Sequence, residues 1–346
     1  MKRIREYGMA IGSIPTGERN QITDVKGVKV GHETIDSGEV QTGVTAIIPA
    51  DGNLFQNKLV AASHVFNGFG KTTGLVQVDE LGTLETPILL TNTLSVGTST
   101  TALVRYMLEQ DEAIGSTTGT VNPVVGECND MLLNDIRKLR LSEEEALSAI
   151  HNAQTDVEEG SVGAGRGMKC FGLKGGIGTS SRKLTYDHGD YTIGVLVLSN
   201  FGKLEEFRLN GNHVGVQLKD QLNGEGDAPD QGSIMMVVAT DLPITSDQLK
   251  RVVKRTGNGL SRTGSFMGNG SGDVAIGFST ANRVPHSAKT LQHMAVVNEN
   301  DLDEAFLAVA DATEEAILNS MVKAETVTGR NQLTLHSLSN YIDNFI

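Results

Sequence analysis

The chain has 346 residues, of which 38% are hydrophobic, with 40 glycines, 7 prolines and no tryptophan. This composition indicates a folded protein with many tight turns and excludes a disordered chain. The formal net charge of −13 argues against nucleic-acid binding, because neutralising phosphates requires a basic surface.

The sequence carries no clear targeting, metal or cofactor signal. No apolar stretch follows the basic residues Lys2 and Arg3, and no run is long enough to span a membrane. Cys128 and Cys170 do not form a CxxC pair, and the eight histidines do not recur at ligand spacing. We therefore expect a cytoplasmic protein that uses no metal or cofactor and binds neither membrane nor nucleic acid.

Short apolar runs rich in Val and Ile predict β-strands, several of them buried on both faces. In chain order, these runs cover 27–31, 42–49, 87–91, 191–198, 234–239 and 273–278. Three helical patterns lie between and after them. Ser142 with Glu145 forms a capping box for a helix to about Ala153, Ser246 is expected to cap a helix that Gly257 ends, and 301–323 is the longest pattern. Buried sheets covered by outer helices are the expected packing of one extensive domain.

A hydroxyl stands at the first position of the most apolar run. Gly232 and Ser233 precede six apolar residues, 234–239, which predict a buried central strand, and a polar, turn-rich stretch at 221–231 precedes them. If the Gly232–Ser233 bond were cut, Ser233 would combine a nucleophilic hydroxyl with an α-amine of pKa about 7.7–8.0, suited to act as a general base. From local sequence alone, an ordinary turn is the commoner explanation.

Other polar residues flank apolar segments. Asn200 terminates a predicted strand, and its amide is suited to donate to an oxyanion. Ser271 lies two residues from Asp273, a hydroxyl–carboxylate pair able to orient Ser233. Glu127 directly follows a short apolar segment, and its carboxylate is suited to pair with a substrate ammonium. Taken singly, each residue also has an ordinary structural explanation. Asn200 fits a strand-end turn, Ser271 with Asp273 fits a glycine-rich loop, and Glu127 fits a surface charge.

Glycine-rich motifs of nucleotide-binding proteins are incomplete in this chain. A P-loop at Gly70 would need a glycine where Val65 stands, and the dinucleotide pattern that starts at Gly163 has Met168 at its third glycine position. There is no GxSxG nucleophile elbow. The glycines at 163–167 and 174–179 therefore favour close approach between backbones, or between backbone and substrate.

Together, these segments resemble peptidase family S58, the DmpA-type family of the L-aminopeptidase/D-esterase and the β-peptidyl aminopeptidases. The resemblance covers nearly the whole chain. The segments that carry it are 20–28, 42–47, 91–97, 123–130, 159–165, 174–179, 199–202, 232–234 with 239–241, and 270–273. It implies an α/β (α+β) fold, a four-layer αββα sandwich similar to Ntn hydrolases but with the topology shared with ornithine acetyltransferases.

The resemblance also implies how the chain matures. Members of the family cut their own chain before the nucleophile, so we expect an α-chain of residues 1–232 and a β-chain of residues 233–346 from a single domain. Cleavage would then follow Gly232, with Ser233 as the nucleophile and Asn200 as the oxyanion donor.

The same resemblance assigns the remaining site residues. Ser271 with Asp273 is the pair that assists the nucleophile, and Glu127 and Asn129 are expected to contact substrate. Asp273 is one methylene shorter than the Glu of the β-peptidyl enzymes, so a water-bridged contact is expected. Asn129 stands where the L-aminopeptidase/D-esterase has a Tyr, so the substrate preference of neither relative transfers.

The leading hypothesis is an autoprocessed serine aminopeptidase or amidase that releases N-terminal residues from peptides, amides or esters through an acyl-enzyme on Ser233. Whether its base is the Ser233 α-amine or the Ser271–Asp273 pair stays open. The alternatives are an ornithine acetyltransferase-type acyltransferase, which Ser233 counts against because those enzymes use Thr, an oligoamide hydrolase, and an uncut binding protein without activity. The resemblance further implies small peptide or amino-acid amide substrates and a homo-oligomer, a tetramer of αβ units.

Overall fold

The computed structural model describes residues 1–222 and 232–346 of the chain. One sheet, here sheet A, contains β1 (Lys29–Ser37), β2 (Val40–Ile48), β5 (Ile88–Asn92) and β6 (Val124–Cys128). The other, sheet B, contains β3 (Asn57–Gly68), β4 (Thr83–Leu84), β9 (Gly176–Tyr186), β10 (Gly189–Asn200), β13 (Ser233–Thr240) and β14 (Gly272–Pro285). The helices are α1 (Leu75–Leu81), α2 (Val96–Gln110), α3 (Glu143–His151), α4 (Gly215–Gln221), α5 (Ser246–Val253), α6 (Thr256–Arg262) and α7 (Leu302–Val322).

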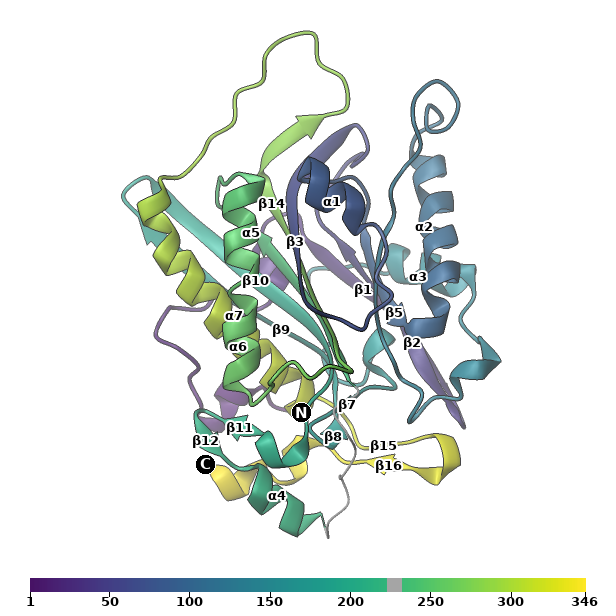
Figure 1. Cartoon of the computed structure of the whole chain (residues 1–346), viewed down its shortest axis with the longest axis vertical. Coiled ribbons are helices and arrows are strands. Elements are labelled where there is room, and N and C mark those ends of the chain that lie inside the picture. The colour runs from purple at the N-terminus through teal and green to yellow at the C-terminus, as the bar shows by residue number, and fades with distance from the viewer. Residues whose placement is uncertain (223–231) are drawn as a thin grey trace.

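The two sheets stack face to face between two layers of helices (Figure 1). Sheet A has the order β1-β2-β5-β6, with α2 and α3 on its outer face, and sheet B has the order β4-β3-β14-β13-β10-β9, covered by α5 and α7 with α6 beside α7. Short two-stranded ribbons are formed by β7 (Lys169–Cys170) with β8 (Leu173–Lys174), β11 (Arg208–Leu209) with β12 (Asn212–His213), and β15 (Val327–Thr328) with β16 (Thr334–Leu335). The predicted αββα sandwich is confirmed.

Strand β13 lies inside sheet B, where it pairs in parallel with β14 and antiparallel with β10. Its alternate side chains enter two different cores. Met235 and Val237 pack between the two sheets, whereas Met236 and Val238 pack beneath α5 and α7. Burial on both faces explains why the strand is apolar without alternation. The expectation of a buried central strand after Gly232 is therefore confirmed.

The helices start and end close to the predicted positions, with two corrections, one at each end of α5. The capping box at Ser142 is present, and the longest helix, α7, covers nearly the predicted range. The cap of α5, however, is Thr245 and not Ser246, because the Thr245 hydroxyl accepts the N–H of Gln248. Gly257 does not end α5, which stops at Val253, but lies within α6.

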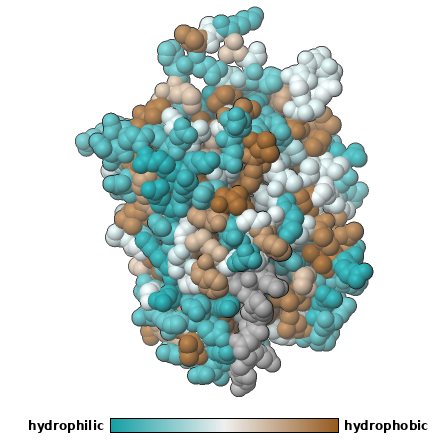
Figure 2. Space-filling model, in the orientation of Figure 1, coloured by the Kyte–Doolittle hydropathy of each residue, from teal (hydrophilic) through white to brown (hydrophobic). Residues whose placement is uncertain are grey.

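The molecular surface mixes hydrophobic and hydrophilic residues on the face shown in Figure 2. Within the described residues, none of the helices combines the length and hydrophobicity that crossing a bilayer requires. Both cysteines, Cys128 and Cys170, are buried and reduced. Of the polar, turn-rich stretch at 221–231, residues 223–231 lie outside the described residues.

Candidate active site

Strand pairing places Ser233 beside two of the predicted site segments. At the start of β13, Ser233 is the register partner of Asn200 at the end of β10 and of Gly272 at the start of β14. Gly272 lies between Ser271 and Asp273 in the chain. Residues from three separate segments therefore meet at one end of sheet B. Of these, Ser233, Asn200, Ser271 and Asp273 are at most 6% exposed.

The peptide bond before Ser233 is closely surrounded. The carbonyl of Gly232 accepts a hydrogen bond from the N–H of Gly272, with a nitrogen–oxygen distance of 3.1 Å. A Cβ atom at position 232 would lie 2.3 Å from the carbonyl oxygen of Asn200 and 2.5 Å from Cα of Phe201. Only glycine fits this position, and the Gly232 carbonyl is already polarised by a backbone donor.

Ser271 and Asp273 form a direct pair. The Ser271 hydroxyl donates to Oδ1 of Asp273 at 2.6 Å, and both side chains are buried. The expected bridging water is therefore not needed for this contact: the two residues sit on either side of Gly272, within reach despite the shorter carboxylate. Asn67 of β3 steadies the preceding loop, because its amide donates to the carbonyls of Gly268, at 3.1 Å, and of Ser271.

The Ser233 hydroxyl itself has no hydrogen-bond partner of standard geometry among the described residues. It lies against the thiol of Cys128, on β6 of sheet A. Burial raises the pKa of this thiol well above its ordinary value, and the charges of Glu127 and Asp273 raise it further. The thiol of Cys128 is therefore neutral, so this side chain lines the site and does not serve as a second nucleophile.

The amide of Asn200 is held at both of its ends. Its Oδ1 accepts the backbone N–H of Lys169 at 2.9 Å, and its Nδ2 donates to the backbone carbonyl of Asn129 at 3.0 Å. A backbone N–H can only donate and a carbonyl can only accept, so these partners fix the orientation of the amide. One hydrogen of Nδ2 remains for a further acceptor.

Asn129 meets this site through its backbone. Its own side chain turns back into the loop, where Oδ1 accepts the N–H of Met131 at 3.1 Å. The side chain is half-buried. The substrate contact expected of Asn129 stays a prediction, whereas its carbonyl contacts Asn200 directly.

Glu127 reaches the same region from sheet A and is only 3% exposed, so it is not a surface charge. Its Oε1 accepts the backbone N–H of Lys71 at 2.8 Å, and its Oε2 accepts the hydroxyl of Thr93. A Cβ atom at Gly70 would lie 3.6 Å from this Oε1 and 3.7 Å from Cα of Gly272. The carboxylate of Glu127 and the start of β14 therefore both lie close to Gly70.

Sequence reasoning missed the residues that hold these groups in place. Lys71, Thr93 and Lys169 contact Glu127 or Asn200, yet two of them act through the backbone, which carries no residue-type signal. Thr93 lies in the 91–97 segment that carries the family resemblance, which is the one sequence signal that pointed to it.

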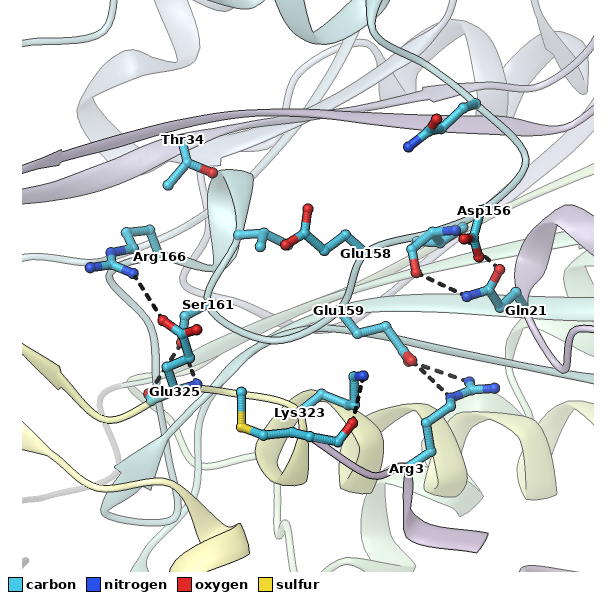
Figure 3. Close-up of a pocket in the computed structure, with 14 residues that line it drawn as sticks. Arg3, Gln21, Thr34, Asp156, Glu158, Glu159, Ser161, Arg166, Lys323 and Glu325 are labelled. Carbon is cyan, nitrogen blue, oxygen red and sulfur yellow. Dashed lines mark hydrogen bonds and ion pairs between the residues drawn. The ribbon is translucent and has the colours of Figure 1, made fainter. Parts of the chain in front are cut away.

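A separate cavity of about 780 Å³ lies elsewhere on the molecule, and none of the predicted site residues lines it. Figure 3 shows that its charged side chains face one another: Arg3 contacts Glu159, and Arg166 approaches Glu325. Lys323 donates to the carbonyl of Met1. Because none of the predicted site residues lines this cavity, the Ser233 region is retained as the candidate active site.

The sequence of the chain matches a known peptidase family. The model of peptidase family S58 matches residues 20–335. The chain belongs to peptidase family S58. It is 39% identical over 359 residues to the β-peptidyl aminopeptidase BapA of Sphingosinicella microcystinivorans, with 97% of this chain and 89% of that protein covered.

Solved structures are similar to this chain over almost its full length. A protein from Pyrococcus horikoshii OT3 superposes with a TM-score of 0.93 at 48% identity, covering 97% of this chain and 96% of that one. The L-aminopeptidase D-Ala-esterase/amidase of Ochrobactrum anthropi, a prototype of the serine aminopeptidases with a variant Ntn hydrolase fold, gives a TM-score of 0.90 at 35% identity, covering 100% and 99%. The predicted family, fold and hydrolase class are confirmed.

Proposed function

We propose that this S58 hydrolase cuts its own chain between Gly232 and Ser233 and then uses Ser233 to release N-terminal residues from peptides, amides or esters. The observation that carries the proposal is the register of β13, which sets Ser233 opposite Asn200 and Gly272. Maturation would leave an α-chain of 1–232 and a β-chain of 233–346. The tetramer of αβ units and the cytoplasmic location stay predictions.

In maturation, the Ser233 hydroxyl oxygen attacks the carbonyl carbon of Gly232. The new C–O bond forms, the C–N bond breaks, and the released nitrogen takes up the hydroxyl proton as the α-amine of Ser233. Water then hydrolyses the ester to a Gly232 carboxylate and a restored hydroxyl. The Gly272 N–H, already bonded to the Gly232 carbonyl oxygen, supports charge on that oxygen during the attack.

In turnover, Glu127 pairs with the ammonium of the substrate, and Ser233 attacks the carbonyl of its first residue. The proton of the hydroxyl passes to the Ser233 α-amine or toward the Ser271–Asp273 pair. The free Nδ2 hydrogen of Asn200 stabilises the oxyanion, a contribution of about 2.7–4 kcal/mol for such donors. The bond between this carbonyl and the leaving amine or alcohol then breaks, and the leaving group takes up the proton. Water hydrolyses the ester that remains, which releases the first residue with a free carboxylate and restores the Ser233 hydroxyl.

Relatives support this substrate class. One is named a β-peptidyl aminopeptidase, and another an L-aminopeptidase and D-Ala-esterase/amidase. Both names describe enzymes that act at the amino end of a small substrate. The buried carboxylate of Glu127 supplies the negative charge that a free α- or β-amine requires, and an N-acylated substrate lacks this amine.

The test compares an aminoacyl p-nitroanilide that has a free amine with its N-acetylated form. We expect the wild-type enzyme to hydrolyse only the first, and Glu127→Gln to raise KM for that substrate about tenfold or more, because one charge-assisted contact is lost. Glu325→Gln, in the separate cavity, is the matched control and is expected to change nothing. Equal hydrolysis of the acetylated substrate, or an unchanged KM in Glu127→Gln, would contradict the assignment.

A further inference from the structure

Lys174, at the end of β8, is fully buried, and its ammonium is bound by backbone carbonyls. Its Nζ donates to the carbonyl oxygens of Gly165 at 2.8 Å, Met168 at 3.0 Å and Gly175 at 2.8 Å. These contacts use all three ammonium protons. Within the described part of the chain, no carboxylate lies within 4.0 Å of Nζ. The positive charge is therefore shared among peptide dipoles.

One of these contacts leads to the active site. The carbonyl of Met168 and the N–H of Lys169 belong to the same peptide group. The carbonyl end binds the Lys174 ammonium, and the N–H end donates to Oδ1 of Asn200 at 2.9 Å. A single planar peptide therefore connects the buried charge to the amide of Asn200.

A cation at the carbonyl of a peptide strengthens the N–H of that peptide as a donor, because hydrogen bonds in a chain polarise one another. The stronger donor in turn draws electron density toward Oδ1 of Asn200, which makes Nδ2 a better donor. The low dielectric around the buried Lys174 leaves this effect little screened. The Gly175 N–H, bound to the Met168 carbonyl at 3.0 Å, adds to it.

We propose that Lys174 is a positioning residue for catalysis: through the Met168–Lys169 peptide, it orients and polarises the Asn200 amide that faces the oxyanion. This inference rests on the proposed role of Asn200 as the oxyanion donor. It explains why a lysine, costly to bury, stands among glycines beside the site. A purely apolar residue would fill the same volume without the charge.

The test is a double-mutant cycle on the matured enzyme, with kcat expressed per cut chain as counted by intact mass. We expect Lys174→Met to lower kcat about tenfold with little change in KM, because the lost interaction acts in the transition state. Asn200→Ala is expected to lower kcat about 10²- to 10³-fold. Adding Lys174→Met to Asn200→Ala is expected to lower kcat by less than about twofold further. Lys323→Met, which removes another ammonium bound to a backbone carbonyl, is the control and should leave kcat unchanged.

Equal losses from Lys174→Met in both backgrounds would overturn the proposal, because Lys174 would then act independently of Asn200. If Asn200→Ala left kcat unchanged, the oxyanion assignment itself would fail, and the two failures are thus distinguishable. Should Lys174→Met not fold, Lys174→Gln keeps two N–H donors without the charge, and the same cycle applies with a smaller expected loss. In that variant, the NMR resonance of the Asn200 side-chain amide should also shift relative to the wild type. An unchanged resonance would contradict the proposed connection through the Met168–Lys169 peptide.

Discussion

Lys174 and Arg182 are both fully buried cations near the same edge of sheet B, yet their charges are satisfied in opposite ways. Arg182, on β9, forms an ion pair with Glu315 of α7 at 2.7 Å, and Glu315 also pairs with Arg5 at 2.8 Å. Lys174, on β8, is bound by three carbonyls. The ion pairs of Glu315 connect the N-terminal segment, β9 and α7. The Lys174 ammonium instead binds the 165–169 loop, whose Lys169 N–H donates to Asn200.

The difference separates a stabilising role from a functional one. A buried ion pair neutralises its own field, so Arg182 exerts little influence beyond its contacts, and its removal leaves a buried carboxylate. A lysine bound only by dipoles keeps its field and passes it along the peptides that it contacts. Burial lowers the pKa of Lys174 well below its ordinary value, whereas the three carbonyls that accept from Nζ favour the ammonium form.

Arg182→Met tests the stabilising side of this comparison and has the larger expected effect. We expect a loss of about 3–5 kcal/mol in the free energy of unfolding, toward the lower end because Arg5 still pairs with Glu315. The kcat of the folded enzyme should stay unchanged. Denaturant titration measures the stability, and Arg251→Met, which breaks an exposed pair with Glu299, serves as the control with less than about 1 kcal/mol. If Arg182→Met lowered kcat as much as Lys174→Met does, the proposed difference between a stabilising Arg182 and a functional Lys174 would be contradicted.

Asp130 carries a carboxyl group whose charge acts on Lys174. Asp130→Asn tests whether this group is a partner of Lys174 in the way that Glu315 is a partner of Arg182. Burial raises the pKa of Asp130 to about 7, against the hydrogen bonds that it accepts from Thr42 and Asn134. The native state therefore binds more protons than the unfolded state between about pH 4 and pH 7, and the free energy of unfolding falls as the pH rises through this range. The variant should lose this decline, a change on the order of a few kcal/mol between the two pH values.

The measurement is the stability difference between wild type and Asp130→Asn at several pH values. This difference isolates Asp130 from His32, whose pKa burial lowers to about 4 and which gives the opposite slope in both proteins. A parallel pair of stability curves would show that Asp130 is ionised throughout and is a true ion-pair partner. Lys174 would then resemble Arg182 more closely than we infer.

Much of the fold could be predicted because apolar runs report burial directly. The strand after Ser233 is apolar on both faces and was predicted correctly, and so was the capping box at Ser142. Strand β9 was not predicted, because most of its residues are small or polar. They are buried because α7 approaches closely: a Cβ at Gly178 would lie 2.0 Å from the Ala316 carbonyl. Such contacts depend on tertiary structure and leave no periodic pattern.

The site was predicted only in part for a related reason. The hydroxyl, amide and carboxylate groups of Ser233, Asn200 and Glu127 are visible as residue types, and the family resemblance implies roles for them that stay predictions. The groups that position them are largely backbone atoms, such as the N–H groups of Lys71 and Lys169. Any residue supplies these atoms, so only the folded chain reveals them.

The most direct test of the central claim is the intact mass of the freshly purified protein. The account predicts two chains that separate on denaturation, the smaller starting at Ser233, and a single 36.8 kDa chain for Ser233→Ala. N-terminal sequencing of the smaller chain would locate the cut. A wild-type protein that hydrolyses aminoacyl amides while remaining uncut, or a Ser233→Ala variant cut at the same bond, would contradict the account.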